Sequence, residues 1–175
     1  MNTSYEEAVK FHGHSCPGLA IGYRMTLAAL DHLNIIRARD EELVAIVEND
    51  ACGTDAVQFI SGCTFGKGNF IFRDHGKMVY VFYKREGGKA VRVSRKTDAK
   101  KQFEGLSRQE IIETILKAPT YDIIQCQEID MEAPEYAKLV PTIICDLCGE
   151  TVMETKSKVL NKKRICIPCY QNYNK

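Results

Sequence analysis

Two Cys-x-x-Cys pairs near the C-terminal end constrain the fold of this chain more than any other feature. The pairs are separated by seventeen residues, and their members are Cys145, Cys148, Cys166 and Cys169. This spacing suits four thiolates arranged tetrahedrally around one zinc ion, with zinc–sulfur distances of about 2.3 Å. Such a short segment cannot bury enough apolar surface to fold alone, and metal binding would supply its folding energy. The sequence therefore predicts one structural zinc ion in a small treble-clef or zinc-ribbon module.

The residues around these cysteines support the module. Gly149 permits a tight knuckle in which backbone amides point at the sulfur atoms. We expect a hairpin with strands at Thr151–Thr155 and Val159–Ile165 around a turn at Lys156–Lys158, followed by a helical turn at Tyr170–Lys175. Four protein ligands leave no coordination position open, so zinc in this module would be structural rather than catalytic.

The predicted hairpin is basic, with five cationic side chains: Lys156, Lys158, Lys162, Lys163 and Arg164. Aromatic side chains are sparse among them, which favours a solvated face over a nucleic-acid interface. The formal net charge of the whole chain is +1, which gives no reason to expect a nucleic-acid or membrane partner.

Composition and length indicate a globular protein of two parts. The chain has 175 residues, of which 45% are hydrophobic and 27% charged, enough for one domain of ordinary size and a small appendage. No apolar run approaches the roughly 18 residues of a membrane span, and Met1–Lys10 carries two glutamates where a signal peptide would be basic and then apolar. We therefore predict a cytoplasmic protein, in which eight cysteines indicate metal binding or thiol chemistry.

Hydrophobic periodicity predicts an α+β core at residues 1–138, followed by the zinc module at residues 139–175. Helices are expected at Ser4–Lys10, Pro17–Asn34, from Asp55 onward and Ser107–Lys117, the last with a Ser107–Glu110 capping box. Strands are expected at Glu42–Glu48, Phe70–Arg73, Met78–Lys84, Lys89–Ser94 and Tyr121–Ile129. Turns at His75-Gly76 and Gly87-Gly88 would join the middle three strands into an antiparallel meander. Pro134–Pro141 is interpreted as the connector.

The most informative chemistry near the N-terminus lies at His12, His14 and Cys16. Residues two apart in an extended segment project to the same side, so two imidazoles and a thiol would converge there as a ligand set. Cys16 also precedes a predicted helix, whose N-terminal amides and dipole favour an anion, so we expect thiolate character.

A second group of chemical residues follows the first predicted strand. Cys52 lies in the loop after that strand, and Asp55 and Gln58 stand one helical turn apart, where they can orient a ligand or substrate. Cys63 fits core packing as well as it fits chemistry, because its spacing matches the apolar side of the helix. Gly62–Asn69 does not have the spacing of a phosphate-binding P-loop, and we interpret it as a backbone-permissive loop near the site.

These two groups of residues resemble the motifs of one protein family. The segments are Phe11-His-Gly-His-Ser-Cys-Pro-Gly18 and Cys52-x-x-Asp55-Ala-x-Gln58, the latter continuing to Gly62-Cys63-Thr64-x-Gly66-Lys67. They resemble the FmdE family, named for a component of formylmethanofuran dehydrogenase, over roughly the first 130 residues. The resemblance implies a dimeric α+β core with a cleft that holds His14, Cys16 and Cys52, and Asp55, Gln58 and Cys63 near it. Some members of the family carry a C-terminal treble-clef module.

The family's name derives from genes beside the molybdenum or tungsten enzyme that fixes carbon dioxide onto methanofuran. The resemblance alone therefore implies an accessory role in one-carbon metabolism with such an enzyme as partner. Our main hypothesis is a second transition metal, zinc or another divalent ion, bound in the cleft by His14, Cys16 and Cys52. If the chain is catalytic, the metal would polarise a carbonyl or activate water, with Asp55 as proton acceptor.

Two other classes of function remain open at the level of sequence. In one, Cys16 is a redox-active thiolate and Cys52 or Cys63 is its resolving partner. In the other, the basic zinc hairpin docks on a larger enzyme or on nucleic acid. The roles of His12 and Cys63, the substrate and the arrangement of the zinc module between protomers are not fixed by the sequence.

Overall fold

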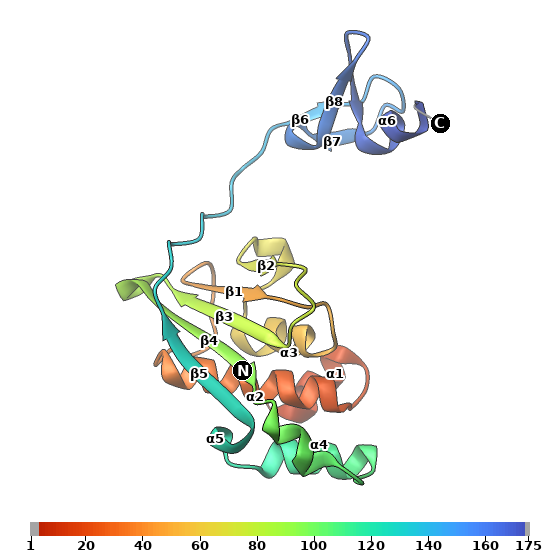
Figure 1. Cartoon of the computed structure of the whole chain (residues 1–175). Helices are drawn as coiled ribbons and strands as arrows, with labels where there is room; N and C mark the ends of the chain where they lie inside the picture. The colour runs from red at the N-terminus through yellow and green to blue at the C-terminus, as the bar shows by residue number, and fades with distance from the viewer. Residues whose placement is uncertain (1–3, 174–175) are drawn as a thin grey trace. The chain divides into compact units, whose positions relative to one another are not determined.

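The computed structural model describes residues 4–173, the side chain at position 100 excepted, and the chain divides into two compact units. The first unit ends at Ala137 and the second begins at Lys138 (Figure 1). Among residues 4–173, no helix has the length and apolar character needed to cross a membrane. The predicted α+β class is confirmed, with a mainly antiparallel sheet packed against helices.

The first unit is built around a five-stranded sheet. Its strands are β1 (Leu43–Val47), β2 (Phe70–Phe72), β3 (Val79–Lys84), β4 (Lys89–Arg95) and β5 (Ile124–Ile129). Its α-helices are α1 (Tyr5–His12), α2 (Pro17–His32), α3 (Gly53–Ser61), α4 (Arg108–Lys117) and α5 (Thr120–Ile123). Short 3-10 helices lie at Phe65–Lys67, Glu86–Gly88 and Asp98–Phe103.

The strand order β2-β1-β3-β4-β5 corrects the predicted meander in one pairing. β1, β3, β4 and β5 pair antiparallel, for example Ala45 opposite Phe82, but β2 pairs parallel with β1 and not with β3. The reason is the helix α3 between β1 and β2, since a strand–helix–strand crossover returns the chain in the same direction. The segment around Gly76 is therefore a passage past β1 rather than a hairpin turn.

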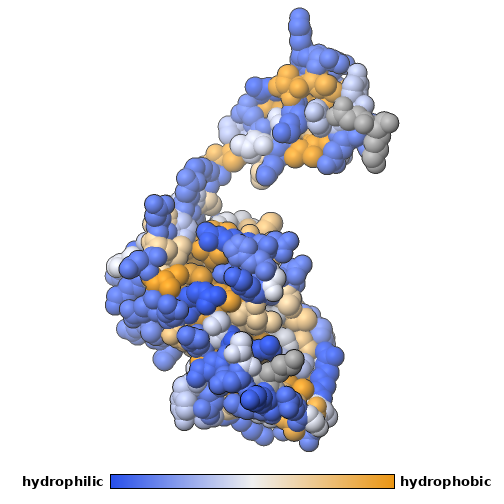
Figure 2. Space-filling model, viewed as in Figure 1, coloured by the Kyte–Doolittle hydropathy of each residue, from blue (hydrophilic) through white to orange (hydrophobic). Residues whose placement is uncertain are grey.

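One face of the sheet packs on the helices and forms the main core. Every residue of β1 is buried, and alternate positions such as Leu43, Ala45 and Val47 belong to the cluster under α2 and α3. The opposite face has a smaller cluster around Val44 and Tyr83. Viewed as in Figure 1, the first unit presents apolar patches within a mainly hydrophilic surface (Figure 2).

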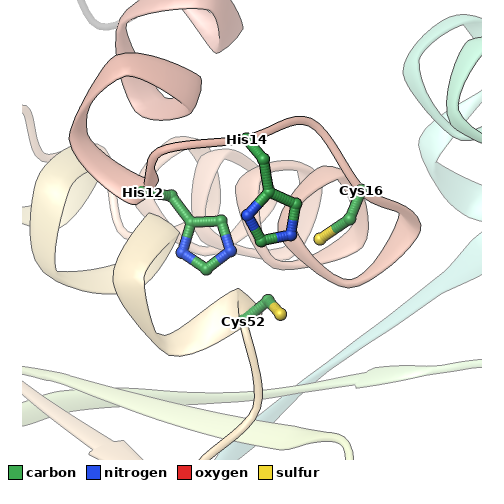
Figure 3. Close-up of side chains that lie close together, drawn as sticks. All are labelled: His12, His14, Cys16 and Cys52. Atoms are coloured by element: carbon green, nitrogen blue, oxygen red, sulfur yellow. The ribbon is translucent and has the colours of Figure 1, made fainter.

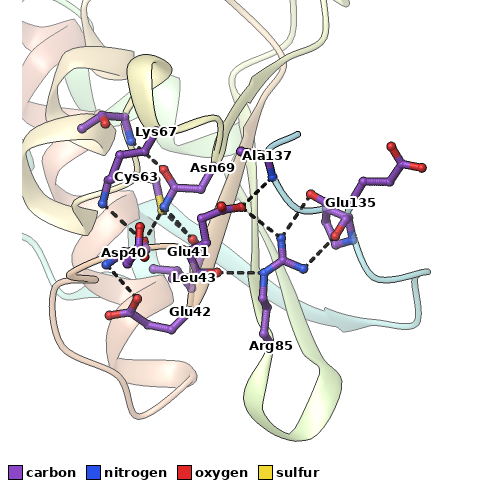
Figure 4. Close-up of polar contacts among 12 residues, drawn as sticks. Asp40, Glu41, Glu42, Leu43, Cys63, Lys67, Asn69, Arg85, Glu135 and Ala137 are labelled. Atoms are coloured by element: carbon purple, nitrogen blue, oxygen red, sulfur yellow. Dashed lines mark hydrogen bonds and ion pairs between the residues drawn. The ribbon is translucent and has the colours of Figure 1, made fainter. Parts of the chain in front are cut away.

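The start of the predicted connector is fixed to the first unit (Figure 4). Arg85 donates from Nη1 to the carbonyl oxygen of Pro134 at 2.7 Å, and its guanidinium lies 3.6 Å from the centre of the Tyr136 ring. The amide of Ala137 donates to Glu41 Oε2 at 3.0 Å. These contacts hold the chain against the first unit up to the point at which the second unit begins.

Several boundaries differ from the sequence-based expectations. α1 continues to His12 instead of ending at Lys10, so the turn-rich segment is shorter than expected. Residues 121–123 of the predicted Tyr121–Ile129 strand belong instead to the helical turn α5, which places Ile123 in the core. The predicted glycine-rich loop contains a 3-10 turn at Phe65–Lys67. The predicted capping box at Ser107 is confirmed.

The second unit consists of two small hairpins and a helix. Its elements are β6 (Thr142–Ile144), β7 (Thr151–Met153), a 3-10 turn (Glu154–Lys156), β8 (Ser157–Leu160), β9 (Lys163–Cys166) and α6 (Ile167–Tyr173). The single predicted hairpin is wrong, because β7 pairs with β6 and β8 pairs with β9. The second turn is made by Asn161 and Lys162 with φ of 49° and 65°, the left-handed backbone that a tight hairpin requires. Residues 174–175 of the predicted terminal turn lie outside the described residues.

Candidate metal centres

The four cysteines of the second unit converge on one point. Each offers a sulfur atom, and these atoms all lie within 4.8 Å of one another. The knuckle after Cys145 closes through a hydrogen bond from the Gly149 amide to the Cys145 carbonyl oxygen at 2.9 Å, with Gly149 at φ 75°. The Cys166 amide donates to Cys145 Sγ at 3.3 Å. The predicted four-thiolate geometry is therefore present.

The electrostatics of these thiols fit a cation. Hydrogen bonds from the backbone amides of Cys148 and Cys166 lower the pKa of the Cys145 thiol to about 6. The neighbouring Cys166 sulfur and burial raise the pKa of Cys169 to about 12. Sulfur atoms this close repel one another when ionised, and a divalent cation removes that repulsion. This arrangement supports a structural zinc ion.

A second cluster lies in the first unit, where four side chains point toward one another (Figure 3). His12, His14, Cys16 and Cys52 each offer a ligand atom, all within 4.8 Å of one another. His12 is the last residue of α1, Cys16 is the N-cap of α2 and Cys52 is the N-cap of α3. Three helix ends therefore meet at this cluster.

The route by which His12 and His14 meet differs from the prediction. His12 is helical rather than extended, so alternation along a strand does not explain the convergence. Instead, Gly13 ends α1 with φ 97°, a left-handed conformation that glycine adopts without strain. The chain reverses there, and the two imidazole rings lie 4.4 Å apart between centroids.

Close contact between α2 and α3 brings Cys16 and Cys52 together. A Cβ added at Gly22 would lie 2.4 Å from Gly53 Cα, so the two helix backbones touch at this point. A Cβ on Gly18 would lie 3.4 Å from Cys52 Cβ, an ordinary van der Waals contact. Residues with side chains at the crossing would separate the two helices and, with them, the two cysteines.

His12 is held by Asp55. The ring Nδ1 lies 2.7 Å from Asp55 Oδ2, and the His12 side chain is only 11% exposed. A carboxylate accepts hydrogen bonds, so we assign the ring proton to Nδ1 and the lone pair to Nε2. Among the buried side-chain nitrogen and oxygen atoms of the described residues, His12 Nε2 is without a hydrogen-bond partner. This is the carboxylate–histidine arrangement that orients metal-binding histidines.

The two thiols of the cluster have distinct surroundings. Cys16 is 3% exposed, and its sulfur accepts a hydrogen bond from the Leu19 amide at 3.3 Å. This contact is the N-terminal helix interaction expected for Cys16. Burial, followed by the neighbouring Cys16 thiol, raises the pKa of Cys52. A bound cation would favour the thiolate of both residues.

Two residues expected near the cluster, Gln58 and Cys63, make their hydrogen bonds with other parts of the first unit. Gln58 accepts a hydrogen bond from the Phe65 amide at 3.2 Å and so stabilises the glycine-rich loop. Cys63 is fully buried, donates to the Leu43 carbonyl oxygen at 3.3 Å, and has its pKa raised to about 11 by burial. The helix α3, about 14 Å long at 1.5 Å per residue, lies between Cys52 and Cys63. Cys63 is therefore a core residue.

The sequence grouped His12 with the expected ligand set but left its role open. It also gave Asp55 the role of proton acceptor, whereas the carboxylate is hydrogen-bonded to His12. The signal for both was available: a histidine before a glycine that ends a helix, and an acidic residue in the first turn of the helix that packs on it. What the sequence lacked was the contact between α1 and α3.

Comparison with known proteins identifies the family. The family model described as "FmdE, Molybdenum formylmethanofuran dehydrogenase operon" matches residues 11–128, two thirds of the chain, including His12, His14, Cys16 and Cys52. The chain belongs to the FmdE family. A second model, the prokaryotic dksA/traR C4-type zinc finger, matches residues 138–175. The FmdE core is thus followed by a zinc finger whose four cysteines support a structural zinc ion.

Two individual proteins resemble this FmdE chain. One is the crystal structure of a tungsten formylmethanofuran dehydrogenase FmdE-like protein from Syntrophus aciditrophicus, 26% identical with a TM-score of 0.73, in a match that covers 97% of this chain and 93% of that one. The other is a probable S-adenosyl-L-methionine-binding protein from Archaeoglobus fulgidus, 26% identical over 194 residues. That match covers 95% of this chain but 52% of the relative, so the chain spans about half of the relative's length.

Proposed function

We propose that the FmdE core of this chain binds one zinc ion through His12, His14, Cys16 and Cys52. The observation that supports this most is the buried Nε2 of His12, which has no hydrogen-bond partner among residues 4–173 and belongs to a side chain held by Asp55. Burying a polar nitrogen without a partner costs about 1–3 kcal/mol, and a metal ion offsets that cost. The proposal adds His12 to the ligands predicted from the sequence.

The donor set fits zinc in both chemistry and charge. Two thiolates and two imidazoles make one of the standard tetrahedral zinc sets. Zn²⁺ with two thiolates is neutral, which suits a site where Cys16 is buried. The N-termini of α2 and α3 add positive partial charge beside the two sulfur atoms and so stabilise the thiolate forms.

A zinc ion at this position would supply Lewis acidity toward a carbonyl or a water molecule. The chain's own residues have three tasks there. Asp55 fixes the orientation and the tautomer of His12. The close crossing of α2 and α3 fixes the distance between the two thiols. Phe11 and Phe59, with ring centroids 5.5 Å apart, place apolar surface beside the last turn of α1.

The biological setting we propose is accessory metal chemistry for a molybdenum or tungsten formylmethanofuran dehydrogenase-type one-carbon system. Support for it comes from the description of the family and the name of the Syntrophus neighbour. A homodimer, a molybdenum or tungsten enzyme as partner and a cytoplasmic location belong to the same proposal. The four-cysteine module would then serve as a structural appendage.

Metal analysis of the purified full chain tests the core of this proposal. We expect two equivalents of zinc in the wild type and one in Cys16→Ser, with mixed sulfur and nitrogen scattering in X-ray absorption of the wild type only. Cys126→Ser is the matched control, because Cys126 is a half-buried cysteine outside both clusters, and it should keep two equivalents. One equivalent in the wild type, with sulfur-only scattering, would refute the proposal.

Thiol redox chemistry is a second candidate, favoured by the closeness of Cys16 and Cys52. Their oxidation would form one sulfur–sulfur bond and pass two electrons and two protons to an added oxidant such as diamide. Cys63 takes no part in this version, because it lies at the far end of α3. Peptide mapping decides between the candidates: a Cys16–Cys52 disulfide in protein isolated without a second metal would favour redox chemistry.

A further inference from the structure

The four donors of the N-terminal cluster are not held equally. We infer that His14 is an exchangeable ligand of the proposed zinc ion, and that an anionic group of a substrate takes its place while His12, Cys16 and Cys52 stay bound. The inference rests on the proposed function, because it presupposes the ion. It goes further by assigning different roles to the four ligands and by naming a class of substrate.

Three of the four donors are fixed by their surroundings. His12 is hydrogen-bonded to Asp55 at 2.7 Å and is almost fully enclosed. Cys16 is buried, with its sulfur anchored by the Leu19 amide. Cys52 is the N-cap of α3 and faces Gly18 of α2 at the point where the two helices pack together. Removal of any of these three donors from the zinc ion would require the helix end that carries it to rearrange.

His14 lacks every one of these restraints. Its side chain is exposed, and its ring contact is the one with His12. Within residues 4–173, no hydrogen bond or ion pair anchors its ring, in contrast to the rings of His12 and His32, which are hydrogen-bonded, and of His75, which pairs with Glu48. The preceding Gly13 has open space around its α-carbon. Rotation of one exposed side chain would therefore free a coordination position without disturbing a helix.

Departure of His14 would convert the cluster to the three-ligand arrangement typical of catalytic zinc. The remaining set, Zn²⁺ with two thiolates and one imidazole, is neutral. The positive ends of α2 and α3 point at it from Cys16 and Cys52, which favours an incoming anion over a neutral or cationic group.

The residues beside the cluster also indicate the chemistry of the part of the substrate that does not bind the metal. Phe11 adjoins His12 in sequence and is 55% exposed, although it is a large apolar residue, and its ring contacts that of Phe59. Phe59 lies one helical turn beyond Asp55 on α3. The substrate class that fits is a small organic anion, such as a carboxylate or thiolate, with an apolar portion that packs on these rings.

Cobalt(II) substitution of the full chain tests the inference, with azide as the anionic probe. Subtraction of the Cys16→Ser spectrum, which reports the four-cysteine site alone, isolates the absorption of the cluster. We expect His14→Ala and His14→Gln to retain two equivalents of cobalt, as the wild type does, while His12→Ala retains one. Azide should shift the wild-type difference spectrum to the one that azide produces in His14→Ala.

The outcomes separate this inference from the function on which it rests. If His14→Ala and His14→Gln lose one equivalent as His12→Ala does, with circular dichroism unchanged, His14 is a permanent ligand and the inference is wrong, while zinc binding stands. An azide-insensitive wild-type spectrum overturns it as well. A wild type that holds one equivalent defeats the proposed function and the inference together.

Discussion

Replacement of Gly22 by alanine tests the claim that the crossing of α2 and α3 sets the geometry of the N-terminal cluster. The added Cβ would lie 2.4 Å from Gly53 Cα and 2.5 Å from its carbonyl oxygen. Restoration of an ordinary 3.4 Å contact requires the helices to move apart by about 1 Å, since both partners are backbone and neither can rotate away. Overpacking of this kind costs about 1–3 kcal/mol, of which the better helix propensity of alanine recovers up to about 1 kcal/mol.

Gly22→Ala should affect the affinity for the second metal ion more strongly than it affects the melting temperature. Metal–ligand distances tolerate about 0.2 Å, so a shift of about 1 Å between Cys16 and Cys52 should lower the affinity of the second metal equivalent by at least about tenfold. The melting temperature should fall by only a few degrees, at about 2–4 °C per kcal/mol for a chain of this size. Competition against a zinc chelator measures the affinity, and differential scanning calorimetry measures the melting temperature.

Gly18→Ala is the matched control for Gly22→Ala. It lies one turn earlier on the same helix, and its added Cβ meets Cys52 Cβ at an acceptable 3.4 Å. We expect near wild-type affinity for the second metal in this variant. Wild-type affinity in Gly22→Ala as well would refute the reasoning, because it would show that helix contact does not set the distance between the two thiols.

Three further changes have expected outcomes of different kinds. Asp55→Asn should weaken binding of the proposed second metal ion by about 10–100-fold with little change in melting temperature, because His12 loses its carboxylate partner. Asp50→Asn, which changes an exposed neighbour, should leave the metal affinity measured by chelator competition unchanged. Arg24→Lys should lower the free energy of unfolding in urea by about 1–3 kcal/mol, because the Arg24 guanidinium donates to three carbonyl oxygens at the end of α4. Arg95→Lys, at an exposed arginine, should leave the free energy of unfolding unchanged. Cys63 has a pKa of about 11 in the folded chain against an ordinary 9.0, so its thiol ionises first in the unfolded chain. The free energy of unfolding should therefore fall by up to about 3 kcal/mol as pH rises from 9 to 11. Cys63→Ala should lose less stability than the wild type between pH 9 and 11. If urea denaturation gives the same pH profile for both proteins, the raised pKa of Cys63 is contradicted.

Features encoded within a few residues could be predicted from the sequence. The two Cys-x-x-Cys pairs determine the four-cysteine geometry because each pair is set by local structure, the first by a knuckle closed at Gly149 and the second by the junction of β9 and α6. Likewise the position of Cys16 just before a helix and the capping box at Ser107 depend on side chains and amides three residues apart. The family resemblance also lies in such short motifs.

Tertiary structure decided how distant segments pair. The sequence predicted the strand β2 but not its neighbour in the sheet. Parallel pairing with β1 is favoured by the crossover through α3 and by the burial of both faces of β1. The same uncertainty explains the missed second hairpin in the zinc module. Strand pairing depends on which surfaces are buried together, and that is not a local property.

The sequence alone identified two groups of candidate ligand side chains, one of four cysteines and one of His14, Cys16 and, through the family resemblance, Cys52. The tertiary structure placed His12 beside His14, Cys16 and Cys52, hydrogen-bonded Asp55 to His12 and buried Cys63 in the core. The physical reason is the glycine contact between α2 and α3, since helix backbones approach this closely only where neither has a side chain.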